Sequence, residues 1–199
     1  MDLKIIGIAG VARVGKDTFA DNLIKRLSQY SISSTKVAFA DVLKQDLREF
    51  LLAKAQIDYT NNEEDKKQLR PLLVEYGKLM RSLSQGAHWI KLVEEKIEKN
   101  AESNIISVIS DLRYANEASW INEKSTGVTI HLSRLGVPPA NEEEKQNDPI
   151  TKSLCQHHLN WKNSDSQPEL RQQVNSHVNR ILYKKFIRSR DNTKTKKRN

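Results

Sequence analysis

The sequence is poor in the residues that mark several classes of protein. Its single cysteine, Cys155, can form no internal disulfide, and 7 Gly with 5 Pro exclude a collagen-like or Pro/Gly-rich chain. It contains no run of about 18 apolar residues that would suggest a membrane span. Residues 1–4 lead directly into a strand-like segment, without the basic and apolar regions of a signal peptide. We therefore expect a soluble, cytoplasmic protein with no membrane partner.

Basic charge is unevenly distributed along the chain. The formal net charge is +8, but residues 184–199 carry eight basic residues against Asp191 alone, a net +7. Residues 1–183 carry 25 basic and 24 acidic residues. We expect one domain over residues 1–187, followed by a basic tail over 188–199. Such a tail is either a solvated, disordered end or a segment that binds the phosphates of DNA.

Hydrophobic periodicity indicates alternating strands and helices. Apolar runs rich in β-branched residues predict strands at 4–9, 36–39, 105–109, 128–132 and 158–161. Apolar residues at helical spacing predict helices over 17–30, 42–55, 69–83, 89–99, 116–124 and 167–187. This order favours an α/β fold with a largely parallel sheet of about five strands. Residues 136–157 have the composition of an exposed, lid-like flap, in which we interpret 142–144 as the solvated start of a helix.

The segment Gly10-Val-Ala-Arg-Val-Gly15-Lys16 matches the pattern G-x-x-x-x-G-K and lies between a predicted strand and a predicted helix. Glycines let the backbone wrap closely around phosphates, and the start of the helix presents its positive end to the anion. Lys16 should reach the β- and γ-phosphates of ATP. The residues expected to bind ATP are Gly10, Arg13, Val14, Gly15, Lys16, Asp17 and Thr18.

Asp17 stands where the common motif has the Ser or Thr that binds Mg²⁺, and Thr18 follows one place later. A carboxylate beside the γ-phosphate can ligate Mg²⁺ directly or through water, or accept the proton of an acceptor hydroxyl. The alternative is an acidic residue that stabilises the first turn of the helix.

Asp111 follows a predicted strand that should lie beside the strand of the phosphate loop. Its carboxylate would emerge at the carboxyl edge of the sheet, where ligands bind in open α/β folds, as a Walker B-like group. Arg113 and Glu117 follow at helical spacing, either as site residues or as a structural ion pair. The residues expected to hold the metal are Asp17, Thr18 and Asp111.

The chain resembles the phage deoxynucleoside monophosphate kinases, a P-loop kinase family to which animal phosphomevalonate kinase also looks related. The resemblance covers about residues 4–136 and rests on Gly15–Thr18, Ala40-Asp41 with Leu43-Lys44, Arg70 with Gly77, Trp89–Lys91, Asp111–Arg113 with Glu117, and Gly127–His131 with Arg134 and Gly136. It implies a P-loop kinase-like three-layer fold, with ATP and Mg²⁺ as phosphoryl donor. It also implies an acceptor nucleotide surrounded by Arg70, Gly77, Trp89, Asp111, Arg113 and Glu117, to which we add Lys44.

Three positions depart from that family's pattern. Val74 and Lys78 stand where such enzymes tend to carry Gln and Thr, and Pro71 replaces a second basic residue. An apolar valine cannot satisfy the hydrogen bonds of a base edge, so base recognition must differ.

Several basic side chains are available to stabilise a phosphoryl transition state: Lys16, Arg13, Lys44, Arg70, Arg81, Arg113 and Arg134. Arg113 and Arg134 stand out because both follow predicted strands, and a guanidinium binds phosphate oxygens with two hydrogen bonds. For Arg13, a solvated side chain in the loop is an equally good interpretation. Trp89 either stacks on a base or packs in the core. The residues expected to act in catalysis are Lys16, Asp17, Asp111, Arg113 and Arg134.

Two functions fit these residues. The first is a kinase that moves the γ-phosphoryl group of ATP to the 5′-phosphate of a deoxynucleoside monophosphate, by positioning and charge neutralisation. The second, implied by phage relatives of this fold, is a DNA-modifying kinase that phosphorylates the hydroxymethyl group of 5-hydroxymethyluracil in DNA. The basic tail, the absent Gln and Thr, and Asp17 as a general base favour the second. A non-catalytic nucleotide-binding switch is a third class, and the oligomeric state, monomer or homodimer, stays open.

Overall fold

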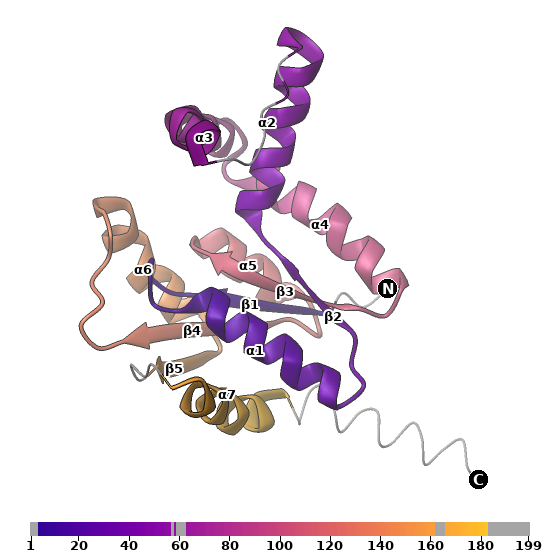
Figure 1. Cartoon of the computed structure of the whole chain (residues 1–199), viewed down its shortest axis with the longest axis vertical. Coiled ribbons are helices and arrows are strands. Elements are labelled where there is room, and N and C mark those ends of the chain that lie inside the picture. The colour runs from indigo at the N-terminus through magenta and orange to yellow at the C-terminus, as the bar shows by residue number, and fades with distance from the viewer. Residues whose placement is uncertain (1–3, 57, 59–62, 162–165, 183–199) are drawn as a thin grey trace.

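A computed structural model describes residues 4–56, 58, 63–161 and 166–182 of the protein. Its sheet has the strand order β2-β3-β1-β4-β5, and every neighbouring pair is parallel. The strands are β1 (Ile5–Ala9), β2 (Ser34–Val37), β3 (Ile106–Leu112), β4 (Val128–Arg134) and β5 (His157–Trp161). The helices are α1 (Lys16–Gln29), α2 (Phe39–Ala55), α3 (Glu63–Ser84), α4 (Ala87–Glu102), α5 (Ala115–Glu123), α6 (Glu142–Leu154) and α7 (Gln167–Leu182). Helices lie on both sides of the sheet (Figure 1), which makes a three-layer α/β fold.

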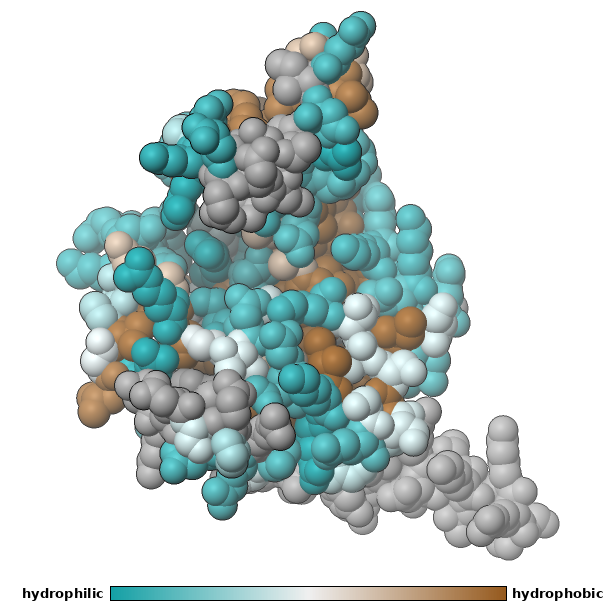
Figure 2. All heavy atoms as spheres, viewed as in Figure 1, coloured by the Kyte–Doolittle hydropathy of each residue, from teal (hydrophilic) through white to brown (hydrophobic). Residues whose placement is uncertain are grey.

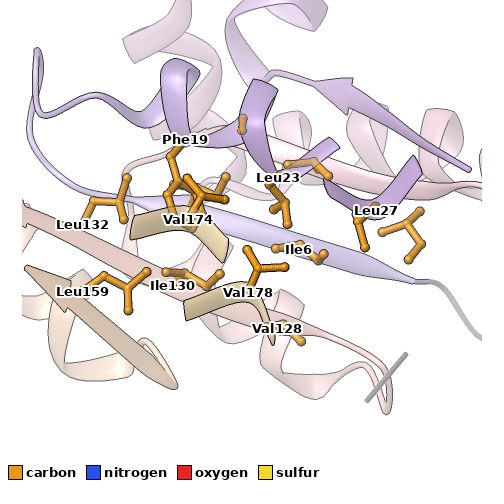
Figure 3. Close-up of a cluster of buried hydrophobic side chains, with 14 of the residues drawn as sticks. Ile6, Phe19, Leu23, Leu27, Val128, Ile130, Leu132, Leu159, Val174 and Val178 are labelled. Carbon is orange, nitrogen blue, oxygen red and sulfur yellow. The ribbon is translucent and has the colours of Figure 1, made fainter. Parts of the chain in front are cut away.

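The two faces of the sheet are covered by different helices, because successive side chains of a strand point to opposite faces. From β1, Ile6 and Ile8 join a cluster with α1 and α7, whereas Ile5 and Ala9 join a cluster with α4 and α5. β1 is buried along its whole length, so the loop that follows it is fixed to the centre of the sheet. Figure 3 shows the first cluster, in which side chains of α1 and α7 lie over β1, β4 and β5, namely Phe19, Leu23, Leu27, Val174 and Val178.

Helices α2 and α3 project away from the sheet, from the end at which β2 finishes (Figure 1). Only Ala38 separates β2 from α2, so the direction of the helix is set by the strand. The Tyr76 hydroxyl of α3 donates to Asp46 Oδ2 of α2 at 2.6 Å. Figure 2 shows hydrophobic residues on the surface of this projection, and the exposed ones include Phe50, Leu52, Leu79 and Leu83.

The predicted fold class, an α/β three-layer fold with a parallel sheet of about five strands, is confirmed. Boundaries differ by a few residues, and because β3 runs to Leu112, Asp111 lies inside the strand rather than after it. The flap predicted over 136–157 is largely helical, since α6 fills most of it with Asn141 as its N-cap. The tail predicted over 188–199 lies outside the described residues. None of the helices described here is both long enough and apolar enough to cross a membrane.

Candidate active site

The loop between β1 and α1 has a backbone conformation that favours glycine at two positions. Gly10 and Gly15 have φ angles of 136° and 102°, in the left-handed region. A Cβ on Gly10 would lie 2.4 Å from the Leu132 carbonyl oxygen of β4. Helix α1 begins at Lys16, directly after Gly15, so its positive end faces the loop. This is the arrangement in which backbone amides bind phosphate groups.

The Lys16 side chain folds back across the loop. Its Nζ donates to the carbonyl oxygens of Gly10 at 2.6 Å and Val11 at 2.9 Å. Burial is the main cause that lowers the pKa of Lys16, ahead of its charged neighbours Arg113, which also lowers it, and Glu144, Asp111 and Asp17, which raise it. Charged groups from α1, α6 and the end of β3 therefore act on one ammonium group.

Asp17 lies at the start of α1 and is 77% exposed. It accepts a hydrogen bond from Ser110 Oγ at 3.0 Å and pairs with Lys36 Nζ at 3.5 Å. A carboxylate and a hydroxyl are oxygen donors of the kind that Mg²⁺ prefers, and Mg²⁺ is usually held by one or two protein carboxylates together with phosphates and water. Asp17 and Ser110 therefore fit a Mg²⁺ ion shared with a nucleotide, and Thr18 stays a predicted ligand.

Among the described residues, no group of three or more His, Cys, Asp or Glu side chains lies close enough together to hold a metal ion. Ser110 was not among the site residues predicted from the sequence, although a hydroxyl residue at the end of a strand, directly before Asp111, was a signal for it.

Asp111 is bound to the start of α2. Its Oδ1 accepts the Phe39 amide and its Oδ2 accepts the Ala40 amide, both at 2.9 Å. Burial raises the pKa of Asp111, and these hydrogen bonds oppose the rise. The N-cap residue of α2 is Ala38, which has no side-chain acceptor, so Asp111 supplies the acceptor that the helix start lacks. Its role as a metal ligand stays a prediction, and the sequence did not reveal its role in fixing α2 to β3.

A cavity of about 270 Å³ lies between α2, α3 and the end of β3. Its apolar side includes Phe39, Leu43, Leu73 and Val74, and its charged side holds five basic and three acidic residues, namely Lys44, Arg70, Lys78, Arg81, Arg113, Asp111, Glu117 and Glu143. The structure brings together every residue predicted to bind the acceptor, since the cavity is lined by Lys44, Arg70, Gly77, Trp89, Arg113 and Glu117.

Glu117 is fully buried, and its ionic partner is Arg81. Arg81 Nη2 donates to Glu117 Oε1 at 2.9 Å, while Glu117 Oε2 accepts the backbone amides of Arg113 at 2.9 Å and Tyr114 at 3.1 Å. The Arg81 guanidinium also lies over the Tyr114 ring, 3.4 Å from Cζ to the ring centroid. The alternative of an Arg113–Glu117 ion pair is therefore wrong. In the part of the chain that the structure describes, the Arg113 guanidinium is exposed and has no ion-pair partner.

The remaining predicted residues lie around this centre. Trp89 is 2% exposed, donates its indole N–H to the Gly77 carbonyl at 3.2 Å and packs edge-on against Tyr76. It therefore forms a wall of the cavity and offers no open face for stacking on a base. Arg13 is exposed in the phosphate loop, with a φ of 63°. Arg134, the last residue of β4, is half-buried and is not among the residues that line the cavity.

The interpretation of 142–144 as the start of a helix is confirmed, and Glu142 and Glu143 are exposed as expected, but Glu144 is half-buried against another part of the chain. Both oxygens of Glu144 accept the Ala12 amide of the phosphate loop, at 3.2 Å and 3.1 Å. The Tyr114 hydroxyl donates to Glu143. Glu142 is 68% exposed, with Lys145 Nζ at 3.6 Å. Composition suggested solvation because it cannot reveal a contact between residues 132 positions apart.

No family model matches the chain, and no curated protein matches its sequence. Among solved structures, the chain is similar to shikimate kinase from Bacteroides thetaiotaomicron, with 13% identity and a TM-score of 0.48 over 89% of this chain and 97% of that one. It is also similar to TT1252 from Thermus thermophilus, with 13% identity and a TM-score of 0.49 over 91% of this chain and 99% of that one.

Proposed function

We propose that this protein is an ATP-dependent phosphotransferase that moves the γ-phosphoryl group of ATP to a small phosphorylated acceptor, a deoxynucleoside monophosphate. The adjacency of the phosphate loop and the charged cavity carries the proposal. Asp111 and Arg113 line the cavity, and both also act on the charge of Lys16 in the loop. A donor phosphate on the loop and an acceptor in the cavity would therefore meet at these residues.

The transfer needs mainly positioning and charge neutralisation. The bond between the γ-phosphorus and the β–γ bridging oxygen breaks, a bond to an acceptor phosphate oxygen forms, and ADP leaves. The loop amides and Lys16 would hold the β- and γ-phosphates, and the guanidinium of Arg113 is available to the transferring group. Mg²⁺, when held by Asp17, Ser110 and the phosphates, supplies further charge neutralisation. A phosphate acceptor is already ionised, so this reaction requires no general base.

The cavity favours a small anionic acceptor with an apolar body. Lys44 and Arg70 offer positive charge to an acceptor phosphate, while Leu43, Leu73 and Val74 offer contact without hydrogen bonds. Its volume of about 270 Å³ lies just below the range of small-molecule sites, roughly 300–1,000 Å³, which suits a small acceptor.

Labelling the acceptor tests the proposal. The protein is incubated with γ-labelled ATP and either mixed deoxynucleoside monophosphates or DNA that contains 5-hydroxymethyluracil. We expect label on a monophosphate, and no label with the Lys16→Met variant. Label on the DNA would instead support a DNA-modifying kinase as the function. Label on neither substrate would contradict a nucleotide acceptor.

A matched pair of arginine variants tests the place of the acceptor. Arg70→Ala should raise KM for the acceptor about tenfold or more, with little change in KM for ATP, because it removes a charge from the cavity. Arg48→Ala removes the same charge from α2 at an exposed pair with Asp58, 2.6 Å apart, and should leave both constants unchanged. Equal effects of the two variants would indicate a general loss of positive charge instead of an acceptor contact.

A further inference from the structure

The first turn of α6 places a carboxylate on the phosphate loop. Both oxygens of Glu144 lie within hydrogen-bond distance of the Ala12 amide. Ala12 lies within the G-x-x-x-x-G-K segment, whose backbone amides cradle phosphate oxygens in such loops. Glu144 also lies close enough to Lys16 to raise its pKa. A carboxylate therefore already occupies a loop amide, close enough to act on the charge of Lys16.

We propose that Glu144 is a built-in occupant of the phosphate site, and that ATP binds only after the first turn of α6 moves off the loop. This inference rests on the proposed function, since the competing ligand is a nucleotide phosphate. It assigns an autoinhibitory contact to the segment that the sequence predicts as a lid. A carboxylate and a phosphate cannot accept the same amide, so each excludes the other.

The part of α6 that moves is bounded by fixed contacts. His131 Nε2 lies 3.0 Å from Asp148 Oδ1, and Thr151 Oγ1 donates to the Arg113 carbonyl at 3.0 Å. Pro149 has no amide hydrogen, so it cannot donate to the carbonyl four residues before it, which weakens the helix at this point. The turn at 142–145 can therefore leave the loop while the second half of α6 stays on the sheet.

A second carboxylate couples the two halves of the site. Glu143 lines the acceptor cavity and accepts the Tyr114 hydroxyl, while the next residue, Glu144, lies on the phosphate loop. Movement of one turn of helix therefore opens the phosphate loop and the acceptor cavity together. Binding of ATP would then make the cavity more accessible to its acceptor.

Glu144 has a structural role that the test must separate. It is the third residue of α6, accepts the Ala140 amide at 2.9 Å, and its own amide donates to Asn141 Oδ1 at 2.8 Å, a helix-capping pattern. Capping boxes use glutamine or glutamate at this position, so Glu144→Gln keeps a side-chain oxygen that can accept the Ala140 amide and removes the charge. Glu142→Gln is the matched control, because it removes one charge from the same turn without touching the loop.

The test measures ATP affinity and amide exchange in the full-length protein. Glu144→Gln should bind ATP about fivefold more tightly or more, because a larger fraction of the molecules has a free loop. Exchange of the Ala12 amide in the ATP-free protein should become faster in the same variant, because hydrogen bonds to a charged acceptor are the stronger ones. Glu142→Gln should change neither quantity.

Each outcome decides the proposal. Equal gains in ATP affinity for both variants would show that the effect comes from net charge, and would overturn the proposal. An unchanged or weaker ATP affinity in Glu144→Gln would also overturn it. If ATP binds to no variant, the proposed function fails and this inference fails with it. If ATP binds equally to all three proteins and is turned over, only the inference of an autoinhibitory contact fails.

Discussion

Arg81 and Glu117 form an ion pair in the wall of the proposed acceptor cavity, with 2.9 Å between Nη2 and Oε1 and side-chain exposures of 22% and 2%. The second oxygen of Glu117 accepts two backbone amides from the segment after β3. The pair therefore joins α3 to the start of α5 and sets the position of Arg113. Removing one partner of a pair this buried lowers the free energy of unfolding more than removing a partner of an ion pair on the surface.

We expect Glu117→Gln to lower the free energy of unfolding by about 3 kcal/mol, because Arg81 loses its countercharge while it stays largely buried. Urea unfolding followed by circular dichroism measures the change. Lys145→Ala, which breaks an exposed pair with Glu142, is the control and should leave the unfolding curve unchanged. If Glu117→Gln unfolds at the same urea concentration as the wild type, the pair does not anchor α3.

The succession of strands and helices along the chain and the phosphate loop could be predicted because their signals are local. The apolar run of β1, the glycines at 10 and 15 and the amphipathic α1 follow one another in the sequence, and each obeys a known spacing. The acceptor residues Arg70, Trp89 and Glu117 came from a family resemblance, and their common position around one cavity was then found in the structure.

The pairings inside the site could not be predicted, because they depend on how distant elements pack. Arg81 and Glu117 are 36 residues apart, and Ala12 and Glu144 are 132 residues apart. In the sequence, Glu144 is one of three adjacent glutamates with the same composition around them. Only the path of the chain from β4 to α6 brings one of them to the phosphate loop.

Lys16→Met should abolish phosphoryl transfer and change how stability depends on pH. Burial lowers the pKa of Lys16 below its usual 10.5, so between the lowered value and 10.5 the unfolded state binds more protons than the folded state. The contribution of Lys16 to stability therefore rises with pH in that window, and methionine removes it. Urea midpoints at about pH 8 and about pH 10 measure the difference.

The stability gained by Lys16→Met relative to the wild type should be larger at the lower pH and smaller at the higher one. A difference that stays constant with pH would show that the ammonium group is not buried as described. Loss of cooperative unfolding in the variant would show that Lys16 is needed for folding, and would contradict its assignment as a phosphate-binding residue.

Cys155, the C-cap residue of α6, should be nearly unreactive in the folded protein. It is 5% exposed, and burial raises the pKa of its thiol to about 12, so the reactive thiolate is scarce near neutral pH. Labelling with a thiol reagent at about pH 8 should be about a thousandfold slower than in urea-unfolded protein. Labelling at similar rates in both would mean that the second half of α6 opens readily. That result would contradict the autoinhibitory contact, which requires this half of the helix to stay on the sheet.

Asp111→Asn should impair phosphoryl transfer, because it displaces the start of α2. The carboxylate accepts the amides of Phe39 and Ala40, and an asparagine side chain can accept only one of them while its own NH₂ faces the other. The start of α2 should then shift, and with it Leu43 and Lys44 in the wall of the cavity. We expect kcat/KM for the acceptor to fall at least about tenfold, about 1.4 kcal/mol of barrier, with a smaller change in ATP affinity.

Asp58→Asn is the control for this variant, because it removes one carboxylate that pairs with Arg48 of α2 on the exposed surface. It should leave kcat/KM unchanged. If Asp111→Asn stays within about threefold of the wild type, under about 0.7 kcal/mol, then neither metal binding nor the position of α2 depends on this carboxylate. If it weakens ATP and acceptor binding equally, the effect is not confined to the acceptor cavity, and the expectation that Asp111 acts through α2 is wrong.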